Sequence, residues 1–145
     1  MGDYAIRMQF DIAADPDTVI DALTSTSGVS RWWSTKVEGS PGDHDGQLMV
    51  WFPDLPQPHE YAVERDGARQ VAWRTMAYPP WWAGTVIRWH VAPHDDAPGT
   101  RLRFSHEGFD PDDEIIAIVT PAWAQIILRL KSYAETGTPA PYFTL

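Results

Sequence analysis

TPAWAQIILRLKSYAETG, residues 120–137, carries the signals of one complete amphipathic helix. Thr120 suits the N-cap, Pro121 suits the first helical position, and Gly137 suits the C-terminal stop. Between these marks, apolar residues recur at helical spacing and form one stripe: Trp123, Ile126, Ile127, Leu130, Tyr133 and Ala134. The stripe is wide and aromatic, so it predicts a helix that covers a sheet, either as ordinary core or as one wall of a cavity.

The helix start is less sharply marked than its end. Residues 110–119 are compatible with a loop, a short helix or an early part of the same helix. A proline inside a helix costs about 3 kcal/mol unless the helix bends there. We therefore favour a helix that starts near Asp112 and bends at Pro121.

Alternating apolar and polar residues ahead of this helix predict an antiparallel sheet. Residues 4–12 show the period-two pattern of a strand with one buried face. Further strands are expected at residues 47–52, 58–65, 69–75, 84–92 and 100–107. Turn signals at residues 65–68 and 95–99 join neighbours as hairpins. Asp15 and Pro16 start a first short helix, a second short turn carries Arg31, Trp32 and Trp33, and residues 38–46 read as loop.

Length, charge and cysteine content narrow the class of protein. The 145 residues suit one domain, residues 1–145, and a net charge of −9 argues against nucleic acid and anionic membrane surfaces as partners. The absence of cysteine excludes disulfides, thiol nucleophiles and zinc–thiolate sites. No phosphate-binding glycine motif, signal segment or membrane-length apolar run is evident. We expect a soluble cytoplasmic protein, without a cofactor and without membrane insertion.

Eight tryptophans are more than a core of this size needs, so several are expected to line a cavity or its mouth. We expect one of Trp32 and Trp33 to anchor the short helices to the sheet and the other to face the pocket. A fully packed core would show the same pattern, so both interpretations stay open. The candidate pocket residues are Trp32, Trp33, Trp51, Trp73, Ile87, Trp89, Phe104, His106, Trp123, Ile127 and Leu130.

His106 is the candidate for a functional polar group. It lies in phase with Leu102 and Phe104, and a histidine titrates close to neutral pH, which suits a general acid or base. A lone histidine at a strand end is more often structural, and Glu107 should point to the opposite face. If the protein is an enzyme, Tyr61 and Thr75 are further candidates for proton handling. The sequence contains no complete catalytic set, so a non-catalytic role is favoured.

Two loop clusters contain potential metal ligands, and one loop is strongly aromatic. Neither His44 with Asp43 and Asp45 nor His94 with Asp95 and Asp96 has a recognised ligand spacing, so we expect solvated turns and no metal site. The stiff loop at residues 78–84 predicts at least one exposed ring. Such a patch would suit a protein partner, bound through Tyr78, Trp81 and Trp82. Monomer and homodimer both remain open.

Motifs along nearly the whole chain resemble the START-related, birch-pollen-allergen-like helix-grip superfamily, also called SRPBCC. Within it, the chain resembles the branch similar to activators of the heat-shock-protein-ninety ATPase. The resemblance rests on residues 10–16 with Val19 and residues 22–24, on residues 31–33, on residues 99–109, and on Trp123, Leu130, Lys131, Tyr133 and Glu135.

This resemblance implies an α+β fold in which a curved antiparallel sheet of about six or seven strands, with two short helices, wraps around the long C-terminal helix. A deep apolar cavity would lie between sheet and helix. Members of the superfamily bind lipids, polyketides and other apolar molecules, and a minority catalyse cyclisation. The favoured expectation is a carrier or sensor of a lipid- or polyketide-like ligand. The alternatives are a cyclase, aromatase or hydrolase using the same pocket, and an interaction or co-chaperone-like module, although the co-chaperone role belongs to longer proteins with a further domain.

Overall fold

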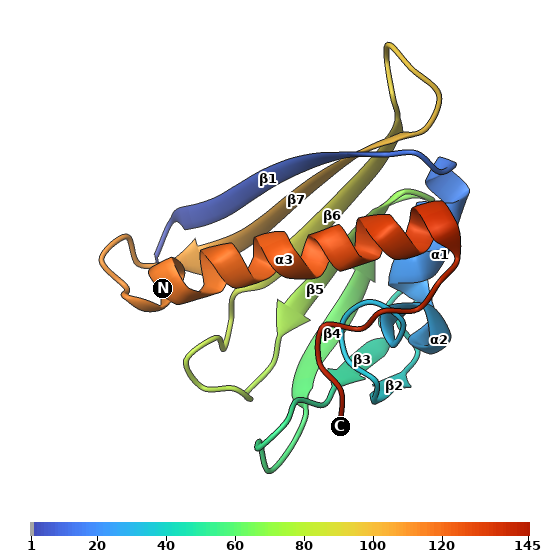
Figure 1. Cartoon of the computed structure of the whole chain (residues 1–145). Coiled ribbons are helices and arrows are strands. Elements are labelled where there is room, and N and C mark those ends of the chain that lie inside the picture. The colour runs from blue at the N-terminus through green and yellow to red at the C-terminus, as the bar shows by residue number, and fades with distance from the viewer. Residues whose placement is uncertain (1) are drawn as a thin grey trace.

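The computed structural model describes residues 2–145, and within that range seven strands form one antiparallel sheet (Figure 1). In chain order the elements are β1 (Tyr4–Ile12), α1 (Pro16–Thr24), α2 (Thr26–Val29), β2 (Val37–Gly39), β3 (Gln47–Val50), β4 (His59–Arg65), β5 (Gln70–Thr75), β6 (Val86–Pro93), β7 (Thr100–Phe109) and α3 (Ile115–Thr136). The strand order is β1-β7-β6-β5-β4-β3-β2, so β2 to β7 form a meander and β1 pairs with its last strand. The predicted α+β architecture is confirmed.

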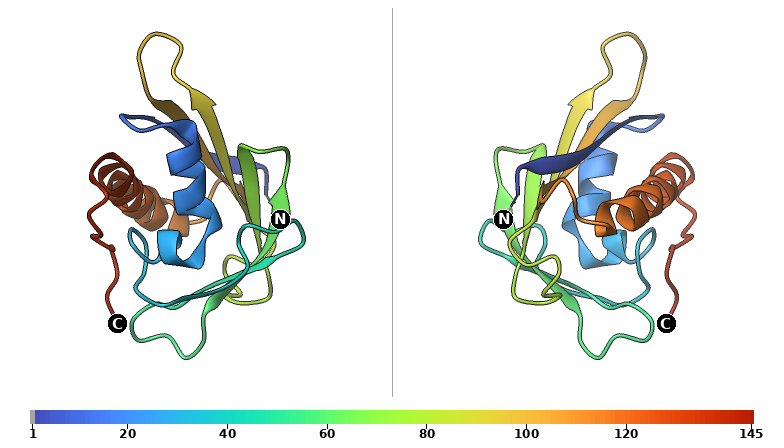
Figure 2. Two further views of the ribbon diagram at one scale, coloured as in Figure 1. Left: turned by 90° about the vertical axis from the view of Figure 1, so that its right-hand side faces the viewer. Right: turned by 90° about the vertical axis from the view of Figure 1, so that its left-hand side faces the viewer.

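The helices lie together on one side of the curved sheet (Figure 2). α3 runs across the concave face, and α1 and α2 cover the end of the sheet near the C-terminal end of α3. Strand residues alternate accordingly: in β7, Leu102, Phe104 and His106 are buried, whereas Arg103 is exposed. Glu107 points outward and pairs with Arg88, as its phase predicted.

The two predicted hairpin turns are confirmed. Between β4 and β5, Asp66 N donates to Gln70 O, and Gly67 has a φ of +74°, a left-handed value that glycine adopts without strain. Between β6 and β7, Gly99 has a φ of +114°. A Cβ at Gly99 would lie 2.5 Å from Ile12 O, so β1 passes too close for any side chain at that position.

α3 begins earlier than its best N-cap signal. The helix starts at Ile115, so a start ahead of Thr120 is confirmed, and the assignment of Thr120 as N-cap is wrong. The Thr120 hydroxyl instead donates back to Ile116 O at 2.6 Å, and Pro121 lies inside the helix. Gly137 ends the helix as predicted, in the left-handed conformation, with its N–H donating to Tyr133 O.

The apolar stripe of α3 packs against the sheet. Its buried residues are Val119, Trp123, Ile126, Ile127 and Leu130. By length and composition alone, residues 115–136 would be able to cross a membrane, which corrects the expectation that no apolar run approaches such a span. The buried stripe packs on the sheet as that of a core helix does.

Two features at the far edge of the sheet have no clear local signal. Residues 38 and 39, expected as the start of a loop, belong to β2 (Val37–Gly39), which pairs with β3, because a short edge strand depends on its neighbour more than on its own pattern. The C-terminal tail runs beside residues 31–35 and hydrogen-bonds to them. Ala140 N donates to Arg31 O and Phe143 N donates to Trp33 O, so the tail holds the tryptophan pair in place.

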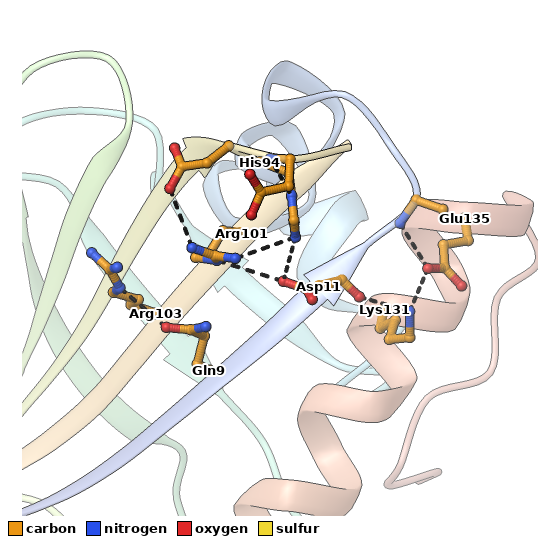
Figure 3. A network of polar contacts seen from close by, with 10 residues as sticks. Gln9, Asp11, His94, Arg101, Arg103, Lys131 and Glu135 are labelled. Carbon is orange, nitrogen blue, oxygen red and sulfur yellow. Dashed lines mark hydrogen bonds and ion pairs between the residues drawn. The ribbon is translucent and has the colours of Figure 1, made fainter. Parts of the chain in front are cut away.

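Polar contacts fasten the C-terminal half of α3 to the end of β1 (Figure 3). Lys131 Nζ donates to Asp11 O at 2.7 Å. The Glu135 carboxylate accepts from Ala13 N at 2.8 Å and from Lys131 Nζ at 2.6 Å. Asp11 in turn lies 3.3 Å from His94 Nε2 on the β6–β7 hairpin. This network fixes where the helix crosses the sheet.

Glu135 should stabilise the fold modestly, and only while ionised. The backbone hydrogen bond from Ala13, followed by Lys131, lowers the pKa of Glu135 below its ordinary value of 4.5. Because the folded pKa is lowered, this stability is present above pH 4.5 and is lost as the pH falls through the folded pKa. We expect Glu135→Ala to lower the free energy of unfolding by about 0.5–1 kcal/mol at pH 7. Urea denaturation at pH 7 and pH 3 measures this, and an equal loss at both would contradict it.

Candidate functional site

Tryptophan rings fill the space between the sheet and α3. Five of them are almost completely buried: Trp32, Trp33, Trp73, Trp89 and Trp123. The centroid of the Trp33 ring lies 5.8 Å from those of Trp32 and Trp73 and 5.2 Å from that of Trp123. The sequence left open whether this space is hollow or packed, and in the structure these rings occupy it.

The two neighbouring tryptophans after α2 have different roles. Both are buried, because residues 30–33 form a turn and the two rings stack side by side at an interplanar angle of 9°. Trp32 Nε1 donates to Ala22 O at 2.9 Å, which ties the turn to α1. Trp33 reaches the end of the core, where it lines an open groove.

This groove is lined by residues from the N-terminal half of α3, the β3–β4 loop, the β5–β6 loop and the C-terminal tail. Its volume is about 310 Å³. Among the described residues that line it, His59 is the only titratable side chain. The lining residues are Trp33, Phe52, Pro53, Leu55, His59, Trp81, Trp82, Ile115, Ile118, Val119, Ala122, Trp123, Ile126 and Phe143.

The rim of the groove is apolar and exposed to solvent. Ile118 is 67% exposed, Trp81 is 51% exposed and Leu55 is 37% exposed. Trp82, next to Trp81, is buried against His106, with ring centroids 4.6 Å apart. The expectation that at least one ring of this loop stands at a rim is therefore confirmed for Trp81.

The structure brings only part of the predicted pocket set to the groove, namely Trp33 and Trp123. Trp51 lies apart from both groove and core. Its Nε1 donates to the Glu38 carboxylate, and the Lys36 ammonium lies over its ring, 4.0 Å from the centroid. The remaining predicted residues are buried between sheet and helix: Trp32, Trp73, Ile87, Trp89, Phe104, His106, Ile127 and Leu130.

His106 is buried, and both of its ring nitrogens are hydrogen-bonded. Trp123 Nε1 donates to Nδ1 at 3.1 Å, so the ring hydrogen sits on Nε2 and donates to Thr85 Oγ1 at 2.9 Å. The Thr85 hydroxyl donates to Trp82 O at 2.7 Å, and Thr75 Oγ1 lies 3.2 Å from Thr85 Oγ1. Burial lowers the pKa of His106 to about 3, so the ring is neutral at pH 7.

His59 was not singled out from the sequence, although β4 carries a signal for it. His59, Tyr61 and Val63 alternate along the strand and are all buried. His59 Nδ1 lies 3.2 Å from the Tyr61 hydroxyl, whereas Nε2 is buried without a hydrogen-bond partner in residues 2–145. Burial lowers the pKa of His59 to about 4 and raises that of Tyr61 well above its usual value.

A larger hollow, of about 970 Å³, lies on the outer face of the sheet. Its lining includes exposed polar and charged side chains such as Arg7, Gln9, Gln70, Arg88 and Arg103. Such a surface stays hydrated and offers little to an apolar molecule. We therefore take the smaller apolar groove as the candidate site. Among residues 2–145, no group of three or more His, Asp or Glu side chains is placed to hold a metal ion.

Comparison with known proteins supports the fold. No protein-family model and no curated protein matches the chain. Among solved structures, it is similar to the Aha1 dimer from Colwellia psychrerythraea, with 24% identity, a TM-score of 0.81, and coverage of 92% of this chain and 98% of that one. A protein from Staphylococcus saprophyticus follows at 14% identity and a TM-score of 0.77, covering 98% of both chains. DynU16, from the dynemicin biosynthetic locus, has 20% identity and a TM-score of 0.75 over 97% of this chain and 51% of its own. The predicted helix-grip fold, similar to that of the Colwellia Aha1 protein, is confirmed.

Proposed function

We propose, from the helix-grip fold that the chain shares with these solved proteins, that it binds a small apolar molecule in the groove beside α3 and acts as a carrier or sensor. The observation that carries the proposal is the groove itself, an open space of about 310 Å³ whose lining is apolar and aromatic apart from one histidine. Small-molecule sites have this character, with volumes of about 300–1,000 Å³ and few polar groups.

The exposed rim supplies the driving force for binding. Leu55, Trp81 and Ile118 present apolar surface to water around the groove. Covering apolar surface gains roughly 25 cal/mol per Å², so a ligand that spans the rim is favoured without any charged contact. A lipid- or polyketide-like compound would satisfy these requirements. Its carrier, in this proposal, is a soluble protein of the cytoplasm. DynU16, which belongs to a biosynthetic locus, adds support for a small organic ligand.

The state of His106 favours binding over catalysis. An enzyme of the cyclase, aromatase or hydrolase type would need a free ring nitrogen on this residue. Both nitrogens are engaged, with Trp123 and Thr85, so His106 would have to give up a buried hydrogen bond before it reached a substrate. Neither of the other candidates contacts His106 directly: Tyr61 contacts His59 instead, and Thr75 is linked to His106 only through Thr85.

The test compares two exposed aliphatic side chains of equal size on α3, an isoleucine and a leucine. Ile118 lines the groove, whereas Leu128 is 51% exposed and lies outside the groove lining. We expect Ile118→Glu to weaken uptake of the neutral fluorescent probe N-phenyl-1-naphthylamine by roughly tenfold or more, because a carboxylate at the rim must be desolvated. Leu128→Glu should bind the probe as the wild type does. Fluorescence titration measures both.

Two outcomes would count against the proposal. Equal probe affinity in a folded Ile118→Glu variant would remove the groove as the site. Failure of the wild-type protein to take up the probe would shift weight to the alternative of a protein partner bound through Tyr78, Trp81 and Trp82, to be tested by loss of that partner in Trp81→Ala. The Colwellia protein was solved as a dimer, so light scattering should accompany these titrations to decide between monomer and homodimer.

A further inference from the structure

His59 presents a buried polar atom that the fold leaves unused. The residue is 4% exposed, lines the groove, and its Nε2 has no hydrogen-bond partner in residues 2–145. Most buried polar atoms in proteins are paired, and leaving one unpaired costs about 1–3 kcal/mol. An unpaired atom of this kind in the wall of an apolar groove is the feature expected of a site that a ligand completes.

The atoms around the His59 ring are aromatic and uncharged. The ring centroid lies 4.4 Å from that of Phe52, 5.3 Å from that of Trp82 and 5.8 Å from that of Trp81, each with edge-to-face geometry. No Lys, Arg, Asp or Glu side chain is among the described residues that line the groove. Flat apolar groups fit this enclosure, and an ionised ligand would be desolvated there without a counter-charge.

The hydrogen-bond pattern indicates which ring nitrogen of His59 carries the hydrogen. The only partner of the Tyr61 hydroxyl within residues 2–145 is His59 Nδ1, at 3.2 Å. If Tyr61 donates to Nδ1, the ring hydrogen resides on Nε2, and only that N–H is unpaired. If Nδ1 instead donated to Tyr61, both the Tyr61 hydrogen and the Nε2 lone pair would be unpaired. The first arrangement has fewer unpaired groups, so Nε2 is a donor.

We propose that the groove takes a neutral ligand with a flat, apolar body and a hydrogen-bond acceptor, such as a ketone or ester carbonyl, which accepts from His59 Nε2. This inference rests on the proposed function, because it names the class of ligand for the same groove. A ligand with an acceptor forms a hydrogen bond with the N–H of His59 Nε2, whereas a pure hydrocarbon leaves this N–H unpaired. The pKa of His59, lowered by burial to about 4, keeps the donor uncharged at pH 7 and agrees with a neutral acceptor.

Trp81 is the most exposed of the rings that pack edge-to-face against His59, so it is the side chain most free to move for a ligand. It is half exposed, whereas its neighbour Trp82 is buried. Its ring packs edge-to-face against those of both His59 and Trp82. Exposed side chains change rotamer within picoseconds to nanoseconds, so a turn of Trp81 toward solvent would widen access to the His59 ring at low cost.

The experiment uses 1-tetralone and tetralin, two fused-ring compounds that differ by one carbonyl. Calorimetric titration gives the affinity of each for the wild type and for His59→Phe, which keeps an aromatic ring and removes the donor. We expect the ketone to lose roughly 3- to 10-fold in affinity relative to the hydrocarbon in His59→Phe. His59→Gln, which retains an N–H, should keep most of the ketone preference. His90→Phe, on the outer face of β6, should change neither affinity.

The outcomes separate this inference from the proposed function. If neither compound binds the wild type, the proposed function fails and this inference fails with it. If tetralin binds but the ratio of the two affinities is the same in wild type and His59→Phe, only the role of His59 is overturned. Long-range proton–nitrogen NMR of the wild type gives a second test without a variant. The ketone should shift the His59 Nε2 resonance and tetralin should not, and equal shifts would contradict the hydrogen bond.

Discussion

Trp33→Ala is expected to lower the free energy of unfolding by about 3–5 kcal/mol, the usual cost of deleting a large buried aromatic side chain. The Trp33 ring is stacked between those of Trp32 and Trp73 at interplanar angles of 9° and 7°. These neighbours are themselves packed, so they cannot move inward to fill the space. Domains are stable by only about 5–15 kcal/mol, so the loss is a large fraction of the total. Urea denaturation followed by far-ultraviolet circular dichroism measures it without relying on tryptophan fluorescence.

Trp81 provides the matched control for this substitution. It is the same residue type at the same groove, but it is half exposed. Trp81→Ala should therefore cost less than about 1 kcal/mol. A Trp33→Ala variant that loses no more stability than Trp81→Ala would show that the aromatic core can collapse around the missing ring.

The outline of the fold was predictable because its signals are local. The period-two patterns of β1 and β7, the hairpin turn at Gly67 and the stop at Gly137 depend on a few neighbouring residues. β2 was missed because its three residues become a strand only by pairing with β3. The early start of α3 was less visible because Pro121, which usually marks a first turn, lies inside the helix.

The site was harder to predict because it depends on how side chains pack across elements. The tryptophan pattern is the same for a hollow interior and a filled one, and only the arrangement of rings around Trp33 shows that it is filled. His106 was recognised from its phase in β7, yet its partners on α3 and on the loop before β6 are far away in sequence. His59 has the same phase signal in β4, but its unpaired nitrogen becomes apparent only in three dimensions.

Mild acid is expected to destabilise the protein strongly through these two histidines. Burial lowers the pKa of His59 to about 4 and that of His106 to about 3, from an ordinary value of 6.5. Between the folded pKa and pH 6.5, each ring binds a proton in the unfolded chain but not in the folded protein, so stability rises with pH. For the two together, the free energy of unfolding should be about 3 kcal/mol lower at pH 5.5 than at pH 8, and about 5 kcal/mol lower at pH 4.5.

A substitution that cannot titrate separates this effect from general acid denaturation. His106→Gln keeps one acceptor for Trp123 and one donor for Thr85, so its cost at pH 8 should be smaller than that of an apolar replacement. Between pH 6 and pH 4.5, the free energy of unfolding of this variant should fall less steeply than that of the wild type. The two slopes should differ by about 1.4 kcal/mol per pH unit, because one of the two proton-binding differences has been removed. Carboxylates with lowered pKa values, such as Glu107 and Glu135, contribute mainly below pH 4.5 and leave this window to the histidines. Denaturant midpoints across the window supply the slopes, and equal slopes for wild type and His106→Gln would mean that His106 is not held neutral by burial.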